Sequence, residues 1–111
     1  MKMRDGNPLD LIVAEHEVIT LLIVKSVGLA EFVNYSLNGT AFPGTKLKSE
    51  PCVVPIQNSG FMGVTVHYVE DSGGSFAIQA TGSAGGDVAV HARKQADGEA
   101  FKTIIYRLSL E

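Results

Sequence analysis

The chain has 111 residues, with 12 acidic and 9 basic side chains and a formal net charge of −3 at pH 7. This length fits a single small domain, and a hydrophobic fraction of 45% excludes an intrinsically disordered chain. This slightly acidic net charge argues against a nucleic-acid-binding protein, which requires a clustered basic surface. The only cysteine, Cys52, excludes an internal disulfide and predicts a cytoplasmic protein, in which Cys52 is a small core residue.

Residues 8–27 are predicted to form a helix. Asn7 and Pro8 are typical of a helix start, and Gly28 is typical of a helix end. The β-branched residues between Val18 and Val24 favour the alternative, a strand. Plotted at 100° per residue, the segment has one broad apolar face. This face contains Leu9, Ile12, Val13, Ile19, Ile23, Val24 and Val27.

A second apolar stripe lies on the opposite side of this predicted helix, at Leu11, Val18, Leu21 and Leu22. A sheet of the same chain can cover only one helix face. We therefore expect the second stripe to contact another copy of the chain, with a dimer as the first expectation. In the alternative arrangement, residues 29–50 fold over the second stripe. The apolar run from Val18 to Val24 is too short to cross a bilayer, so no membrane partner is expected.

The middle of the chain carries turn signals. Residues 32–37 and 40–42 flank Asn38-Gly39, which is typical of a tight hairpin turn. Residues 45–50 are predicted to form a polar loop. Residues 53–56 are expected to form an edge strand, because Pro55 cannot donate a hydrogen bond within a central ladder.

The last fifty residues alternate between apolar and polar side chains in four segments. These segments are centred on residues 64–69, 76–81, 88–93 and 103–110, and turn residues separate them at 71–74, 82–86 and 96–98. The pattern predicts a four-stranded meander with one apolar face under the helix and one open polar face.

The open face of this meander would carry the candidate ligand site. Pairing the first two hairpins around their turns places His67, Ala77 and His91 in one row, with the two histidines nearly 10 Å apart. The flanking side chains are Gln79, Arg93 and Arg107, and we expect this shallow surface to accept an anionic or hydrogen-bonding ligand. A solvated polar face is the simpler alternative.

No other feature predicts a catalytic or metal site. His16 belongs to the apolar helix face, Glu70-Asp71 is a turn pair, and residues 82–86 lack the lysine of a phosphate-binding loop. The histidine spacing is too wide for a metal site. We therefore expect no cofactor, no metal and no catalytic residues.

The glycine-punctuated stretch from Ser72 to Val90, continued by residues 101–104, resembles the C-terminal meander of the cytochrome-oxidase assembly factor and mitochondrial translocase-subunit superfamily. That resemblance implies a helix placed before a sheet and an assembly or tethering role rather than catalysis. It implies no site residues, and the sequence predicts no membrane anchor of the kind that superfamily carries.

The predicted fold class is therefore α+β, with one N-terminal helix packed on an antiparallel sheet of five or six strands in a single domain, residues 1–111. The expected function is a non-catalytic binding or assembly module that acts as a homo-oligomer. A small-ligand binder or enzyme that uses the open sheet face around His67 and His91 is the alternative.

Overall fold

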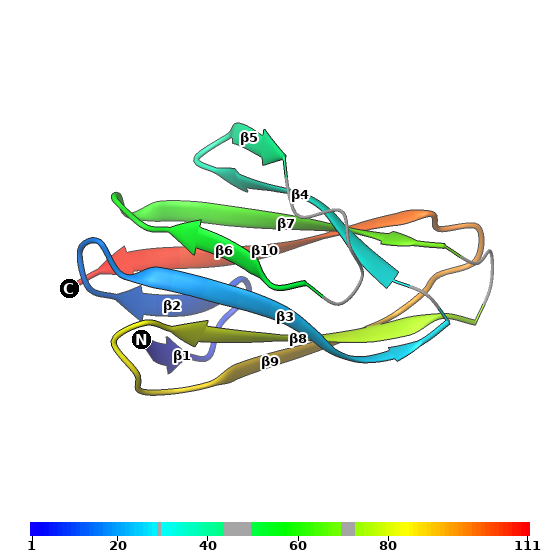
Figure 1. The fold of residues 1–111 in the computed structure, drawn as a ribbon, viewed down its shortest axis with the longest axis horizontal. Helices are drawn as coiled ribbons and strands as arrows, with labels where there is room; N and C mark the ends of the chain where they lie inside the picture. The colour runs from blue at the N-terminus through cyan, green and yellow to red at the C-terminus, as the bar shows by residue number, and fades with distance from the viewer. Residues whose placement is uncertain (29, 44–49, 70–72) are drawn as a thin grey trace.

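The computed structural model describes residues 1–28, 30–43, 50–69 and 73–111. These residues form ten β-strands and no helix (Figure 1). Consequently none of them belongs to a helix that is long and apolar enough to span a membrane. In chain order the strands are β1 (Lys2–Arg4), β2 (Leu9–Val13), β3 (Val18–Val27), β4 (Ala30–Leu37), β5 (Thr40–Pro43), β6 (Cys52–Pro55), β7 (Gly60–Tyr68), β8 (Ser75–Gly82), β9 (Ala89–Lys94) and β10 (Phe101–Leu110).

The strands form two sheets. The six-stranded sheet has the order β1-β2-β10-β7-β4-β5, and the four-stranded sheet has the order β6-β3-β8-β9. Neighbouring strands are antiparallel except β2 and β10, which are parallel. The longer strands run along the long axis of the molecule, and both chain ends lie at the same end of it (Figure 1).

The core lies between the inner faces of the two sheets. Burying one large apolar side chain contributes about 1.5–3 kcal/mol, so a continuous core of this kind is the main stabilising feature of the fold. The largest side chains with less than 2% exposure are Tyr106, Phe32, Leu11, Ile19, Leu21, Ile56, Met62, Ile78, Val13, Val54, Val64 and Val66.

The predicted helix at residues 8–27 is wrong, and with it the α+β fold class. This segment forms β2 and β3, joined by a tight turn in which His16 has φ of 65° and the Glu17 N–H donates to the Ala14 carbonyl at 3.0 Å. The strand alternative at Val18 to Val24 is the one that the structure adopts. Alternate residues of β3 such as Ile19 and Leu21 are fully buried, as the period of a strand requires.

The predicted meander is also wrong, although all four of its strands exist. Only β8 and β9 pair with each other, whereas β7 and β10 pair with one another in the six-stranded sheet. The chain therefore changes sheets between β7 and β8 and again between β9 and β10. Turn residues mark where a strand ends, but they are the same whether the next strand pairs alongside or crosses to the facing sheet.

Two local predictions are confirmed. β4 and β5 form the hairpin, and Asn38 and Gly39 have φ of 50° and 84°, as a primed turn requires. β6 is an edge strand of the four-stranded sheet and contains Pro55. The predicted loop at 45–50 and the predicted turn at 71–74 fall largely on residues 44–49 and 70–72, which lie outside the described residues.

Candidate functional sites

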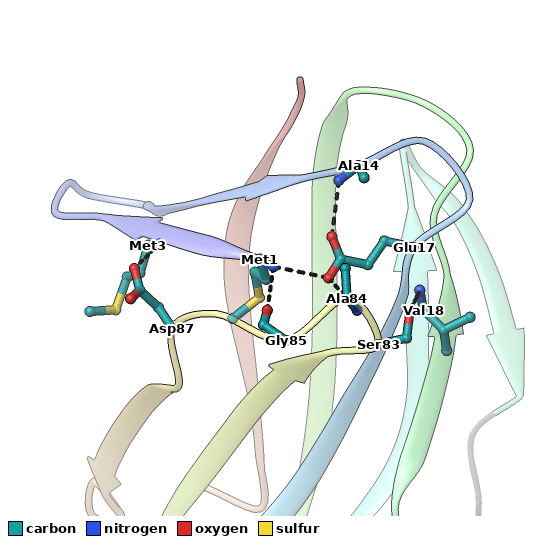
Figure 2. A network of polar contacts seen from close by, with 9 residues as sticks. All are labelled: Met1, Met3, Ala14, Glu17, Val18, Ser83, Ala84, Gly85 and Asp87. Carbon is teal, nitrogen blue, oxygen red and sulfur yellow. Dashed lines mark hydrogen bonds and ion pairs between the residues drawn. The ribbon is translucent and has the colours of Figure 1, made fainter.

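A buried polar network joins the start of the chain to two loops (Figure 2). The Met1 ammonium group contacts Glu17 Oε2 at 3.0 Å and donates to the Gly85 carbonyl at 2.7 Å. The Glu17 side chain is 1% exposed and also accepts hydrogen bonds from the Ala14 N–H at 2.9 Å and the Ala84 N–H at 3.1 Å. Burial alone would raise the pKa of Glu17, but these hydrogen bonds and the ammonium charge together hold the pKa below its usual value.

The same network connects the two sheets along one side of the sandwich. The Asp87 N–H donates to the Met1 carbonyl at 2.8 Å, and the Met3 N–H donates to Asp87 Oδ2 at 2.9 Å. β1 belongs to the six-stranded sheet, whereas residues 83–87 lead from β8 to β9 of the four-stranded sheet. These contacts close the seam between the sheets beside β1, and their role is structural.

Beyond this closed seam the sheets separate into a cleft of about 610 Å³, the inter-sheet cleft. One wall is β9, where His91 and Arg93 lie on the same side of the strand as the buried Ala89. The opposite side is the first half of β10, from Lys102 to Ile105. This half precedes the pairing of β10 with β2, and residues from both of its faces border the cleft. The β1–β2 turn from Asp5 to Pro8 borders the cleft as well. Cationic and apolar side chains thus face the same space.

His91 is the most unusual side chain of this cleft. Its Nε2 atom is buried and has no hydrogen-bond partner among the described residues. Its ring meets the Tyr106 ring edge-on at a centroid distance of 6.1 Å. Burial, helped by the Arg93 charge, lowers the pKa of His91, because both disfavour the imidazolium form. Burial also raises the pKa of Tyr106 to about 12, and its hydroxyl has no partner within the described chain.

The lowered pKa of His91 predicts that acid destabilises the fold. In the unfolded chain His91 takes up a proton near its ordinary pKa of 6.5, whereas in the folded chain His91 resists protonation. The free energy of unfolding should therefore be highest above this pH and fall as the pH decreases through it. Urea unfolding between about pH 7.5 and 5.5 measures this, and His91→Gln should flatten the dependence.

His16→Gln is the matched control, because the His16 side chain is 75% exposed. The His16→Gln variant should show the same pH dependence of the free energy of unfolding as the wild type. An unchanged slope in His91→Gln would contradict the assignment of this acid sensitivity to His91.

A second candidate surface is the outer face of the four-stranded sheet. Paired residues of neighbouring strands point to the same face, and the pairs here are Thr20 with Val53, Leu22 with Gln79, and Gln79 with Val90. We define the outer patch as four apolar residues of this face on β3, β6 and β9. It contains Val18, Leu22, Val53 and Val90, of which Val53 is 51% and Val90 is 59% exposed, and Val18 and Leu22 are half-buried.

The predicted ligand residues do not share one face. His91 and Arg93 line the inter-sheet cleft, and the row with His67 and Ala77 does not form, because Ala77 pairs with Ala92 and His91 pairs with Ile78. The meander on which that row depended is replaced by two sheets. His67 lies on the six-stranded sheet instead.

The other predicted ligand residues are equally dispersed. His67 Nδ1 lies 3.2 Å from Glu31 Oε1, and its ring stacks on Phe101 at a centroid distance of 4.8 Å. The Arg107 guanidinium lies 6.0 Å from the centre of the Phe61 ring. Gln79 lies among the residues of the outer patch.

The predicted interface residues divide into two pairs. Leu11 and Leu21 have 0% exposure and belong to the core of the chain itself. Val18 and Leu22 lie in the outer patch. The helix that suggested a second copy is absent from the described residues, but two of its four interface residues still face outward.

The remaining candidates offer little reactivity. Cys52 is buried, and burial raises the pKa of its thiol, which disfavours the reactive thiolate. Within the described ranges no group of three or more His, Cys, Asp or Glu side chains is placed to hold a metal ion. Sequence reasoning missed Lys102 as a cleft residue and Glu17 as a buried network residue. The only signal of the buried role of Glu17 is that this glutamate lies within an apolar segment.

Comparison of the chain with protein-family models, with curated proteins and with solved structures gives no match. The resemblance to the assembly-factor superfamily therefore stays a prediction. The helix that this resemblance implies before the sheet is replaced by β2 and β3.

Proposed function

We propose that this chain is a non-catalytic assembly module that forms a homodimer through the outer patch. The observation that supports the proposal is the set of apolar side chains on the outer face of the four-stranded sheet. Val53 and Val90 are more than half exposed there, and Val18 and Leu22 lie on β3, which neighbours the β6 strand of Val53 and is separated from the β9 strand of Val90 by β8. Thr20 and Gln79 lie among these apolar residues, and exposed apolar residues bordered by polar ones are typical of a protein contact.

The distribution of charge supports the same face. On the strands of the four-stranded sheet, the charged side chains of the outer face are Lys25 and Lys94, near one end. The outer face of the six-stranded sheet instead carries Glu31, His67 and Arg107. Interface centres are depleted of charged residues, so the four-stranded sheet is the better candidate.

A symmetric dimer would place two outer patches face to face. Facing sheets pack about 10 Å apart with interdigitating side chains, and a two-fold axis lets one surface serve both copies.

The double variant Val18→Glu, Leu22→Glu tests the proposal. Two carboxylates at the centre of the patch should abolish association, because a desolvated unpaired charge is strongly unfavourable. Light scattering after size exclusion should give a dimer for the wild type and the 11.8 kDa monomer for the variant. Circular dichroism should show an unchanged β spectrum.

Phe101→Glu, Ile105→Glu is the matched control. These side chains are 56% and 45% exposed on the outer face of the six-stranded sheet. This control should remain dimeric. A monomeric wild type, or a double variant at Val18 and Leu22 with the wild-type mass, would refute the assembly role.

A further inference from the structure

We propose that the inter-sheet cleft binds a small organic acid, with one carboxylate attached to an apolar body. The site shares Val90 with the outer patch, but its charged residues lie outside that patch and its occupation does not require the dimer. The proposal rests on the charges, the unpaired donors and the apolar lining of the cleft.

The charges of the cleft favour a monoanion. Arg93 and Lys102 line it, and neither forms an ion pair within 4.0 Å in the part of the chain that the structure describes. Asp5 supplies one carboxylate to the same lining. With His91 neutral, two cations and one anion leave a single net positive charge. One carboxylate balances that charge, whereas a doubly charged phosphate exceeds it.

The donors suit a carboxylate in geometry as well as charge. A guanidinium group presents parallel N–H donors that match the two oxygens of a carboxylate, and Arg93 is the guanidinium of this cleft. The ring of His91 also lines the cleft, but its Nε2 atom is shielded from solvent, so Arg93 and Lys102 are the groups available to the ligand. Glu99 is absent from the cleft lining.

Asn7 and Thr103 add polar groups to the lining, but one part of it is apolar and suits a hydrocarbon body. Pro8, Leu9, Phe61 and Ile104 border the same space. The volume of about 610 Å³ lies within the range of small-ligand sites, about 300–1,000 Å³. A free inorganic anion would leave this apolar lining without a partner.

Titration with phenylacetate, followed by amide NMR of the full chain, tests the proposal. Saturable shifts are expected at residues 90–93 and 102–105. Phenylacetamide, which has the same shape and no charge, should bind at least about tenfold more weakly, because it loses the charge-assisted hydrogen bonds. Inorganic phosphate should produce no saturable shift at these amides.

Arg93→Gln and Lys102→Gln should each weaken phenylacetate binding at least about tenfold. Lys94→Gln is the matched control, since Lys94 is the next residue of β9 and lies on the outer face of the sheet. It should bind as the wild type does. The amide spectrum of each variant reports its folding directly.

Three results would overturn the proposal. They are the absence of saturable shifts up to about 10 mM phenylacetate, equal affinity for phenylacetamide, and wild-type affinity in both cleft variants. The mass measurements that test the dimer are independent of all three, so either proposal can fail alone.

Discussion

Glu17→Gln should lower the free energy of unfolding by about 3–5 kcal/mol, because it breaks a buried ion pair on one side only. The Met1 ammonium would remain buried opposite a neutral amide, and the amide can accept fewer hydrogen bonds than the three that Glu17 accepts from Met1, Ala14 and Ala84. Urea unfolding at neutral pH gives the difference directly.

A pH series separates this electrostatic effect from a packing effect. The pKa of Glu17 is lowered in the folded chain, so its contribution is present above the ordinary value of 4.5 and is lost as the pH falls through the folded pKa. The wild type should lose this stability in acid, and Glu17→Gln should already lack it. The control is Glu15→Gln, whose side chain is 70% exposed and should change stability by less than about 0.5 kcal/mol. Equal urea midpoints for Glu17→Gln and the wild type would exclude a stabilising network.

The apolar residues on both faces of β3 explain why residues 8–27 suggest a helix. The period of β3 is hidden, because its outward positions Val18 and Leu22 are as apolar as the inward positions Ile19 and Leu21. A strand with two apolar faces has no alternation, and at 100° per residue it gives apolar stripes on two sides. The same feature that misleads the prediction of the fold supports the proposed interface.

Local signals predict the structure correctly where the chain decides it within a few residues. Asn38-Gly39 favours the positive φ values that close the β4–β5 hairpin, and Pro55 fits the edge of a sheet. The α-helical reading of Asn7-Pro8 failed because the same residues also suit a turn between β1 and β2. Short motifs define ends and turns, but not which strands pair.

The candidate cleft depends on pairings that are distant in sequence. His91 and Arg93 come from β9, Lys102 comes from β10, and these strands lie in different sheets. The sequence identified two of these three residues by their type. It could not place them, because the crossing between sheets depends on the packing of the whole core.

Gly86→Ala should destabilise the fold by about 3 kcal/mol or more, through two effects at the closed seam. Gly86 has φ of 98°, in a region that alanine adopts at a cost of about 1–3 kcal/mol. An added Cβ would also collide with the Met1 carbonyl oxygen, which accepts the hydrogen bond from the Asp87 N–H. The position of the added Cβ is fixed by the backbone of residue 86, and the Met1 carbonyl is itself a backbone group. The collision can therefore be relieved only by moving β1 away from the 83–87 loop.

Gly85→Ala distinguishes the two effects. Gly85 has φ of 79°, but a Cβ there would meet nothing within 4 Å, so the variant carries the backbone strain without the collision. It should cost about 1–2 kcal/mol. Hydrogen exchange should show β1 amides losing protection in Gly86→Ala and keeping it in Gly85→Ala, because only the first variant separates β1 from the loop. Equal losses of stability in the two variants would mean that the contact between Met1 and Gly86 does not hold the seam closed.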